Sequence, residues 1–461
     1  MTKQETVIQY ITDNYLNFNT LRHDVVSDKL QIRMEKPTPN PSLKGGEYGA
    51  EQKSFPLWED LGVATVWREM TKHDINSIVC HCAQEYNANI TSREVMTALQ
   101  SDLIPDVHPL REYILSLHPY TSDQPDWIDL VASQVRIADS ASDSEKGSNG
   151  SKSSKGESAV ETYRTYRTPS TKADALWRAC FKKWFVAMVA SWMKDEVVNH
   201  QVLVLIGKQG IFKTTWLEHL IPPHLRAYAC KLANSNDLNK DERLRIAEFG
   251  LISLDEIDSM NNRELNQLKS VITATDINER AAYAYTKERR MRLASFCASG
   301  NRRDFLTDIT GNRRWLPFEV ESIQNPFYTT LPYDLIYAQA WTLAQDPTFS
   351  YWFELDEIDL LEQHNQHFRD ESNEEQLLDV YFAVPSEGAS NTKFLTTAEI
   401  SERLIYYGNI KRPLSLSRLG VLLSQKGFLS IRKGSPQRRG WVVYERDNEE
   451  INAERRILSK T

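Results

Sequence analysis

Residues 202–216 read VLVLIGKQGIFKTTW, and this stretch decides how the centre of the chain is organised. Its aliphatic start predicts a short buried strand, GKQG predicts a tight turn, and TTWLEHL begins a helical pattern. A strand, a glycine loop, a Lys-Thr pair and a helix allow backbone N–H groups to surround a triphosphate. We therefore predict a nucleotide-binding loop made of Gly207, Gln209, Gly210, Ile211, Phe212, Lys213, Thr214 and Thr215.

Two residues of this loop are expected to contact the phosphates and their metal ion. Lys213 would reach the β- and γ-phosphates, and the Thr214 hydroxyl would bind Mg²⁺. Phe212 stands where the usual loop pattern has glycine. For the loop taken alone, a chance glycine turn between a strand and a helix therefore remains an alternative.

Acidic residues follow the next apolar strand, where LISL at 251–254 ends in Asp255 and Glu256. In P-loop ATPases the first acid of such a pair binds Mg²⁺, and the second acts as general base toward the attacking water. An acidic pair at a strand end is common by itself. Its position after a glycine loop and the helical segment that follows the loop predicts a site for ATP and Mg²⁺.

A third strand, MRLASFCAS at 291–299, ends just before Asn301, whose amide could contact the γ-phosphate or the attacking water. TGNRRW then places Arg313 and Arg314 immediately before the apolar segment WLPFEV. Arginines here could reach the nucleotide of a neighbouring subunit and stabilise charge that develops in the transition state. Each piece alone also fits a solvated surface, whereas the four in this order favour an ATPase.

The same order of motifs, with LDEIDSMNNRELNQLKSVIT and SGNRRDFLTDITGNRRW as its most specific part, resembles the superfamily 3 helicases of the AAA+ class. It is similar in particular to the virulence-associated E family of phages and mobile genetic elements. The resemblance spans residues 21–361, apart from an insert and a linker. It implies an α/β fold with a P-loop AAA+-type ATPase core.

The resemblance also implies roles for single residues. Lys213, Glu256 and Asn301 would be catalytic, Asp255 would bind Mg²⁺ with Thr214, and either Arg313 or Arg314 would be an arginine finger. Because such a finger acts on a neighbour, we expect a homo-hexameric ring. The implied activity is that of an ATP-driven DNA helicase that replicates a phage or mobile element.

A basic run with tyrosines lies between the acidic pair and Asn301, in ERAAYAYTKERRMR at 279–292. In the helicases that the chain resembles, a hairpin in this region points into the ring channel. Basic groups can contact phosphates while aromatic rings stack on bases. The candidate contacts to single-stranded or forked DNA are Arg280, Lys287, Arg289 and Arg290, and Arg292 lies in the same run. A solvated charged hairpin is the alternative.

Near the C-terminus, LTTAEISERLIYYG and SLSRLGVLLSQKG predict two helices, and FLSIRKGSPQRRGWVVYE predicts two strands around a turn. Two helices followed by a β-hairpin indicate a winged-helix-like domain. The region is locally basic on an acidic chain, which favours phosphate contact, although winged helices also dock proteins. Its candidate DNA contacts are Arg418, Lys426, Arg432, Lys433, Arg438 and Arg439.

The whole chain is expected to form several domains, because 461 residues exceed one ordinary core. A helix at 175–193 carries a broad apolar stripe, which fits core packing or a membrane surface. We predict an N-terminal accessory α+β domain at 1–138 with a Pro/Gly-rich insert near 36–54, a flexible linker at 139–172, the ATPase core at 173–347, an acidic helical connector at 348–390, the winged-helix-like domain at 391–446 and a charged tail at 447–461.

Bulk properties place limits on the class of protein. The net charge of −8 excludes a uniformly basic protein, and five scattered cysteines indicate reduced thiols. No secretory signal or bilayer-spanning run is visible, so a bacterial cytoplasmic location without membrane contact is expected. No primase signature is visible either, and a separate primase is therefore an expected partner. Two other functions stay open: an ATP-switched assembly factor that does not unwind DNA, and a nucleotide-binding scaffold without turnover.

Overall fold

The computed structural model describes ten stretches of the chain: residues 2–34, 66–138, 171–232, 246–279, 288–306, 312–369, 373–386, 392–408, 415–435 and 437–458. The predicted insert near 36–54 and nearly all of the predicted linker lie outside these stretches. The chain divides into two compact units. Unit 1 comprises Met1–Arg303 and Arg313–Asn365, and unit 2 comprises Asp304–Asn312 and Gln366–Thr461.

A six-stranded sheet forms the centre of unit 1, and its strands lie in the order β5-β12-β6-β11-β8-β7. All neighbours are parallel except the edge strand β5, which is antiparallel to β12. Strands β6, β8 and β11 are buried along their whole length, which explains why their sequences are mostly apolar and carry no charge. The strands are β5 (Val135–Ile137), β6 (Val202–Ile206), β7 (Ala229–Leu232), β8 (Leu251–Leu254), β11 (Ser295–Gly300) and β12 (Trp315–Ile323).

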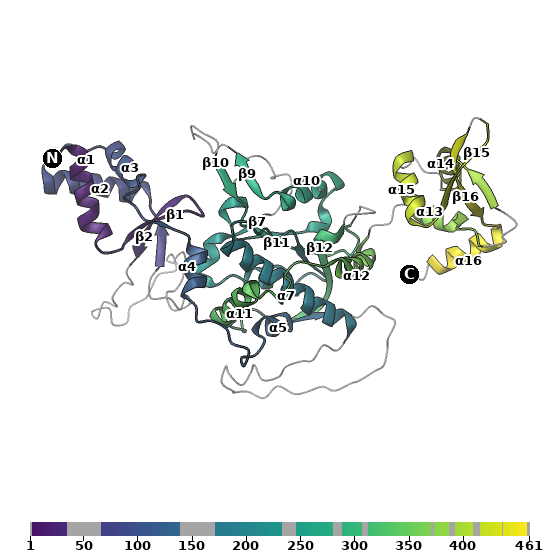
Figure 1. Cartoon of the computed structure of the whole chain (residues 1–461), viewed down its shortest axis with the longest axis horizontal. Coiled ribbons are helices and arrows are strands. Elements are labelled where there is room, and N and C mark those ends of the chain that lie inside the picture. The colour runs from purple at the N-terminus through teal and green to yellow at the C-terminus, as the bar shows by residue number, and fades with distance from the viewer. Residues whose placement is uncertain are drawn as a thin grey trace. The chain divides into compact units, whose positions relative to one another are not determined.

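Helix α7 (Lys172–Met193) is the main packing helix of this sheet. Figure 1 shows it with α5 (Trp127–Ala132) and α11 (Tyr333–Gln345) on one side of the strands. Most of its apolar residues are buried, and the indole N–H groups of Trp184 and Trp192 donate to the carbonyls of Phe296 and Gly250 at 3.1 and 3.0 Å. These contacts confirm the core-packing interpretation of this helix. None of the helices in the described stretches has the length and apolar character that a bilayer span requires.

The N-terminal part of unit 1 is a second α/β layer. Its sheet has the order β3-β2-β1-β4, and helices α1, α2 and α3 pack beside it. The Tyr228 hydroxyl, on the short helix η3 (Pro223–Tyr228) of the core, donates to the buried Asp24 at 2.8 Å. The elements are α1 (Lys3–Ile11), β1 (Leu21–Asp24), β2 (Lys29–Met34), β3 (Val66–Glu69), α2 (Lys72–Tyr86), α3 (Ser92–Leu99) and β4 (Asp106–Val107). The next helix, α4 (Pro109–Ser116), packs against the central core instead.

In the structure, the predicted segments 1–138 and 348–390 are each shared between two parts of the fold. Strand β5 and helix α5 precede residue 138 in sequence, yet they belong to the central sheet and its helical layer. The acidic segment 348–390 is shared between the units, with α12 (Leu355–Asn365) in unit 1 and α13 (Asn373–Tyr381) in unit 2. Local composition does not reveal such boundaries, because they depend on which remote surface buries each element.

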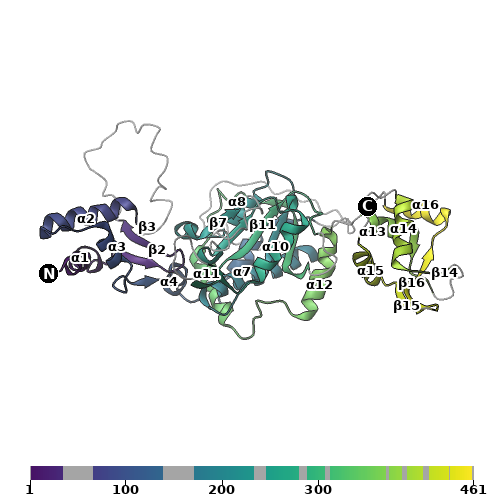
Figure 2. The same ribbon diagram turned by 90° about the horizontal axis from the view of Figure 1, so that it is seen from above.

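Unit 2 is built around strand β16 (Arg438–Glu445), which pairs with three other strands. Helices α14 and α15 lie beside these strands in Figure 2, and residues such as Leu404, Leu422 and Trp441 form a separate core. The two helices and two strands predicted here are confirmed. The elements are β13 (Phe382–Ala383), β14 (Thr392–Leu395), α14 (Thr397–Gly408), α15 (Leu416–Gln425), β15 (Leu429–Lys433) and α16 (Asn448–Leu458).

Candidate nucleotide-binding site

Three predicted motifs meet at one edge of the central sheet. The glycine loop follows β6, the acidic pair follows β8, and Asn301 follows β11. Because these are neighbouring parallel strands, their carboxyl ends lie together, which is where open α/β sheets bind ligands. They enclose a cavity of about 310 Å³. Its lining comprises Gln209, Gly210, Phe212, Lys213, Thr214, Thr215, Asp255, Glu256, Ser299, Gly300 and Asn301.

Lys213 is the buried cation of this cavity, and it is 7% exposed. Its Nζ donates to the carbonyls of Gly207 and Lys208, both at 2.7 Å, and to Oδ1 of Asn301 at 3.3 Å. Burial lowers the pKa of Lys213, against the opposing effect of nearby carboxylates. Neutral oxygens hold the ammonium in place without cancelling its charge, so the group is suited to an incoming phosphate.

Thr214 and Asp255 share a hydrogen-bonded cluster with Ser299. The Thr214 hydroxyl lies 3.2 Å from Oδ1 of Asp255 and 2.9 Å from the Ser299 hydroxyl, which itself donates to Asp255 at 2.7 Å. Lys231 Nζ lies 2.8 Å from the other carboxylate oxygen. Burial alone would raise the pKa of Asp255, but the bonds from Lys231, Ser299 and Thr214 outweigh it and lower this pKa. The carboxylate is therefore kept ionised.

A Mg²⁺ ion fits the chemistry of this cluster, because a hydroxyl and a carboxylate oxygen are the hard ligands that it prefers. Among the described residues, no group of three or more His, Cys, Asp or Glu side chains could hold a metal ion. Thr214 and Asp255 would thus supply only part of the coordination. Nucleotide phosphates and water normally complete such Mg²⁺ sites.

The backbone of the glycine loop adopts conformations that explain its sequence. A Cβ on Gly207 would lie 2.7 Å from the Val320 carbonyl oxygen, so only glycine permits this close approach. Gly210 has φ of +86°, in the left-handed region. Phe212 also lies there, with φ of 69° and ψ of 18°. The loop keeps the geometry that glycine usually supplies at this position, at a cost of roughly 1–2 kcal/mol for a residue with a side chain.

Glu256 is a second strained residue at the cavity. It has φ of 52° and ψ of 48°, and its side chain is exposed. Such a conformation costs about 1–3 kcal/mol in a residue other than glycine and is concentrated at functional sites. Next to it, the Asp258 carboxylate accepts the backbone N–H groups of Asn301 at 3.2 Å and Arg302 at 3.1 Å. Asp258 thereby fixes the backbone that carries the Asn301 amide.

Three of these residues had no role in the sequence interpretation. Ser299 had a detectable signal, since it is the polar end of an apolar strand that stops beside Asn301. Asp258 lies close to the acidic pair, but its partners are remote in sequence. Lys231 had no signal, because only the pairing of β7 with β8 brings it to Asp255.

The arginine pair lies at the other end of these parallel strands, beside their amino ends. Trp315 pairs with Val202 and Glu319 with Ile206, so Arg313 and Arg314 precede the amino end of β12. The length of β6, about 13 Å at 3.3 Å per residue, therefore separates them from the glycine loop of their own chain. We conclude that neither arginine belongs to the cavity that Lys213 lines.

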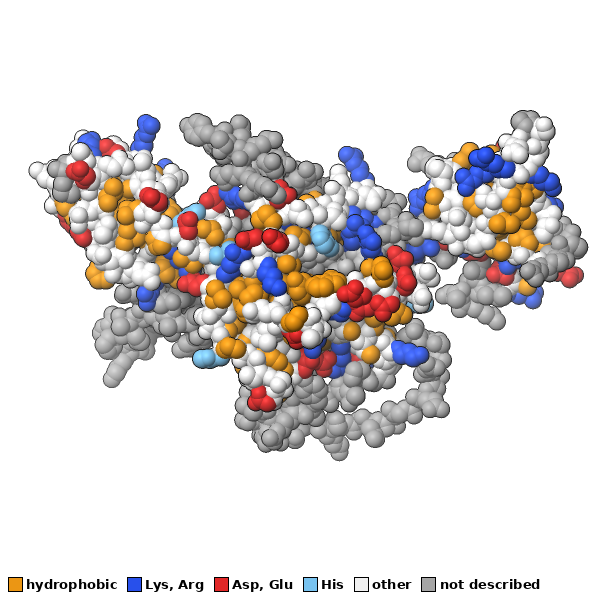
Figure 3. Space-filling model, viewed as in Figure 1, with side chains coloured by type: hydrophobic (Ala, Val, Ile, Leu, Met, Phe, Trp, Pro, Cys, Tyr) orange, Lys and Arg blue, Asp and Glu red, His pale blue; other side chains and the backbone are white. Residues whose placement is uncertain are grey.

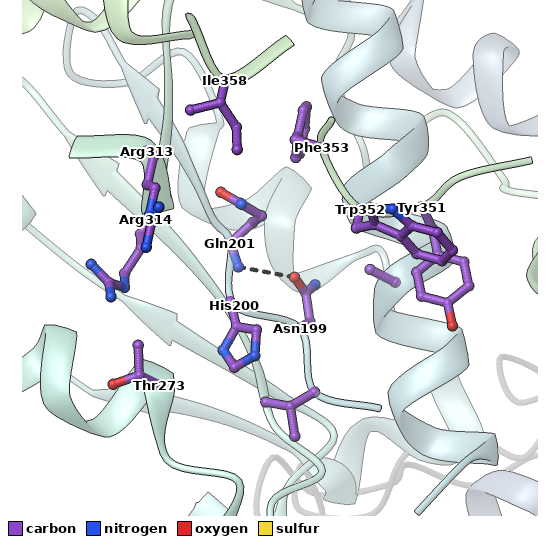
Figure 4. Close-up of a pocket in the computed structure, with 12 residues that line it drawn as sticks. Asn199, His200, Gln201, Thr273, Arg313, Arg314, Tyr351, Trp352, Phe353 and Ile358 are labelled. Atoms are coloured by element: carbon purple, nitrogen blue, oxygen red, sulfur yellow. Dashed lines mark hydrogen bonds between the residues drawn. The ribbon is translucent and has the colours of Figure 1, made fainter. Parts of the chain in front are cut away.

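A second cavity, of about 360 Å³, surrounds this arginine pair. Figure 4 shows the two arginines on one side of His200 and Gln201, with the aromatic residues 351–353 on the other. Oriented to satisfy both of its polar atoms, the Gln201 amide donates to the backbone carbonyls of both arginines. No ion pair joins either guanidinium to a carboxylate within the described stretches. Gln201 therefore holds the pair by its backbone, and these bonds do not involve the guanidinium groups.

Residues 152–370 match the family model of the virulence-associated protein E-like domain. The chain carries a virulence-associated protein E-like domain. This match confirms the family resemblance of the motifs and covers the glycine loop, the acidic pair, Asn301 and both arginines. It begins after the N-terminal layer and stops early in unit 2, so the virulence-associated protein E-like domain is flanked by further structure on both sides.

Solved structures that are similar to this chain include the C-terminal region of NrS-1. An apo structure of its residues 305–718 has a TM-score of 0.41 and 10% sequence identity, with 96% of this chain and all of that chain covered. An A-form apo structure of the same region has a TM-score of 0.42 and 10% identity, with 94% and 98% covered. No curated protein matches the chain in sequence.

The basic hairpin of the virulence-associated protein E-like domain is formed by β9 (Asp276–Glu279) and β10 (Glu288–Met291). Arg280 and Lys287 lie outside the described stretches, as does the side chain of Arg289. Arg290 contacts Asp28 of the N-terminal layer at 2.6 Å. Arg290 also lies 3.8 Å from Glu248, so carboxylates already balance the charge of this partly exposed side chain.

Arg292, which belongs to the same basic run, is not a surface residue of this hairpin. It is 1% exposed, and burial lowers its pKa to about 9. Its guanidinium donates to three backbone carbonyls, those of Ala274, Ala294 and Asn199, at 2.8–2.9 Å. These bonds tie the end of β10 to the residues that precede β6 and β11. The local sequence of a basic run does not show which of its arginine side chains is buried.

Four of the basic residues predicted in unit 2 face one another across a hairpin. Arg432 pairs with Arg439 and Lys433 with Arg438 in the β15–β16 register, and all four are exposed. Figure 3 shows Lys and Arg side chains gathered on the upper part of this unit. Like charges directly opposite each other are destabilising, so this hairpin favours an anionic partner.

The other two basic residues are placed differently. Lys426 Nζ contacts Asp379 at 2.5 Å and Glu375 at 3.5 Å, so carboxylates of α13 already neutralise it. Arg418 lies in the first turn of α15, where the Ser415 hydroxyl caps its backbone N–H. The charge of Lys426 is therefore balanced by carboxylates of its own unit.

Proposed function

We propose that this chain is an ATP-hydrolysing P-loop ATPase of the AAA+ type. The observation that carries the proposal is the meeting of Lys213, Thr214, Asp255 and Asn301 in one cavity at the carboxyl ends of β6, β8 and β11. These residues come from three separate motifs, and their order was predicted from sequence alone. A charged lysine, a hydroxyl–carboxylate pair and an amide are the groups that phosphoryl transfer requires.

In the proposed mechanism, the loop backbone and Lys213 would hold the triphosphate, and Thr214 and Asp255 would hold Mg²⁺. The metal ion would neutralise charge on the phosphates. Glu256 orients the attacking water and accepts its proton, and the Asn301 amide fixes that water or the γ-phosphate. Asp258 positions Asn301 by accepting its backbone N–H.

We further propose that ATP hydrolysis drives a DNA helicase in the replication of a phage or mobile element. The virulence-associated protein E-like domain and the exposed basic hairpin of unit 2 support a role on DNA. The distance of the arginine pair from the Lys213 cavity supports action on the nucleotide of another copy, and we propose that the copies form a homo-hexameric ring. Unit 2 would be a winged-helix-like module, and a separate primase would start synthesis.

Strand displacement from a forked duplex tests this proposal. We expect ATP-dependent unwinding by the wild-type protein and none by Lys213→Ala, because the alanine variant lacks the cation that faces the phosphates. DNA-stimulated hydrolysis without strand separation would instead establish the assembly-factor function. If Lys213→Ala and the wild type hydrolyse ATP equally, the site proposed here is not the active site.

The hairpin of unit 2 gives a prediction about salt dependence. Replacing Arg432 and Arg439 with Ala is expected to weaken DNA binding and to reduce the slope of log affinity against log salt by about 1 for each phosphate that the variant no longer neutralises. Anisotropy of labelled single-stranded DNA over a salt series measures this slope. Lys393→Ala is the matched control, because Lys393 lies in the same sheet but contacts Glu445 at 2.5 Å. Equal slopes for all three proteins would contradict the assignment.

A further inference from the structure

An exposed phenylalanine lies beside the candidate nucleotide cavity without a role in the mechanism above. Phe327 is 69% exposed, although it belongs to the well-packed unit 1. Its ring is nearly perpendicular to the rings of Phe212 and His219, with centroid distances of 6.4 and 5.6 Å. These two residues flank the helix α8 (Lys213–Glu218) that leads out of the phosphate loop.

The segment that carries Phe327 is anchored on both sides. Asn325 accepts the Phe327 N–H through its side chain at 3.0 Å and the Tyr328 N–H through its carbonyl at 3.1 Å. Further along, the Tyr333 hydroxyl donates to the His219 carbonyl at 2.7 Å, which ties the segment to the end of α8. An exposed aromatic ring on an anchored segment can bind a partner with little further loss of conformational entropy.

The neighbouring residues indicate what that partner is. Phe212 and Thr215 line the cavity, and the His219 ring lies 2.7 Å from the Thr215 carbonyl, one turn further along the chain. A triphosphate held by Lys213 and Thr214 would have Thr215 beside it, and His219 links Thr215 to Phe327 through its contact with the Thr215 carbonyl and its ring contact at 5.6 Å. A nucleobase is flat and apolar on its faces, so it stacks on aromatic side chains.

We infer that the base of the bound nucleotide stacks on the ring of Phe327. The rings of Phe212 and His219 fix the orientation of the Phe327 ring. This inference rests on the proposed function, since it assigns the base end of the same ATP site. It also gives a reason for the phenylalanine at position 212, where the loop pattern has glycine: its ring supports Phe327.

Comparison of ATP with inorganic triphosphate tests the inference, because triphosphate occupies the phosphate site but has no base. We expect Phe327→Ala to weaken ATP binding by roughly 5- to 150-fold, the loss that corresponds to one base–aromatic stack. Its affinity for Mg²⁺-triphosphate should equal that of the wild type. Phe327→Trp should restore most of the ATP affinity. Calorimetric titration of the full chain with each ligand measures these values.

The controls separate this inference from the proposed function. Phe18→Ala removes an aromatic side chain that is 66% exposed in the N-terminal layer, and both affinities should stay unchanged. An equal loss of ATP and triphosphate binding in Phe327→Ala, or no loss of either, would overturn the stacking inference. A change in oligomeric mass with both affinities intact would likewise overturn it, in favour of a subunit contact. If the wild-type protein binds neither ligand, the proposed function itself fails.

Discussion

Replacing Glu256 with Gln is expected to leave ATP binding intact while it lowers hydrolysis by about 10²- to 10⁴-fold. Glutamine has nearly the same shape but cannot accept a proton from water. Glu256 is exposed at the cavity, and Lys213 and Asp255 are held by other groups, so the phosphate and metal contacts should persist. Titration with ATP and steady-state phosphate release on the same protein preparation measure the two quantities separately.

Glu85→Gln is the matched control for this variant. Glu85 is exposed on α2 in the N-terminal layer, and the same loss of one charge there should leave turnover unchanged. If Glu256→Gln hydrolyses ATP at the wild-type rate, another residue accepts the proton. A parallel loss of binding would show that the strained backbone at Glu256 has collapsed, and the assignment of a base would then have no support.

Removing the arginine finger should have an effect of similar or greater size. We expect Arg313→Ala or Arg314→Ala to lower hydrolysis by about 10³- to 10⁵-fold, the range seen when such a finger is absent. The variant whose activity falls identifies the finger. ATP binding should remain, because the strand register places both residues at the sheet edge opposite Lys213.

Mixing experiments reveal whether the arginine acts on its own chain or on a neighbour. Lys213→Ala has intact arginines, and the inactive arginine variant has an intact phosphate site, so a head-to-tail contact between them restores one complete site. Random mixing in equal amounts should restore about a quarter of the sites. Arg93→Ala, which changes an exposed arginine of α3, should be fully active by itself. No recovery on mixing would exclude action on a neighbour.

The residues of the candidate site were largely predictable because each lies at the end of a short apolar strand. A glycine loop after VLVLI, an acidic pair after LISL and an asparagine after FCASG are local signals. Parallel pairing then brings strand ends together without any further information. The helix at 175–193 was similarly clear, since its apolar stripe requires a buried partner.

Charged residues were less predictable, because their roles depend on partners that are remote in sequence. Arg290 and Arg292 are two positions apart in one basic run, yet one meets Asp28 on the surface and the other is buried among carbonyls. Lys426 has the local sequence of a DNA contact, but the fold places carboxylates of α13 beside it. Sequence patterns give the charge of such residues but not the identity of the atoms that surround them.

By itself, the sequence predicted the family resemblance, the order of the site motifs and the elements that carry them, because strands, loops and caps follow from local periodicity and residue type. The tertiary structure alone decided that the arginine pair lies across the sheet from Lys213, that Lys231 and Ser299 hold Asp255, and that Phe327 stands beside Phe212. These relations depend on strand order and side-chain packing. Both are set by contacts between segments far apart in the chain, which no local pattern records.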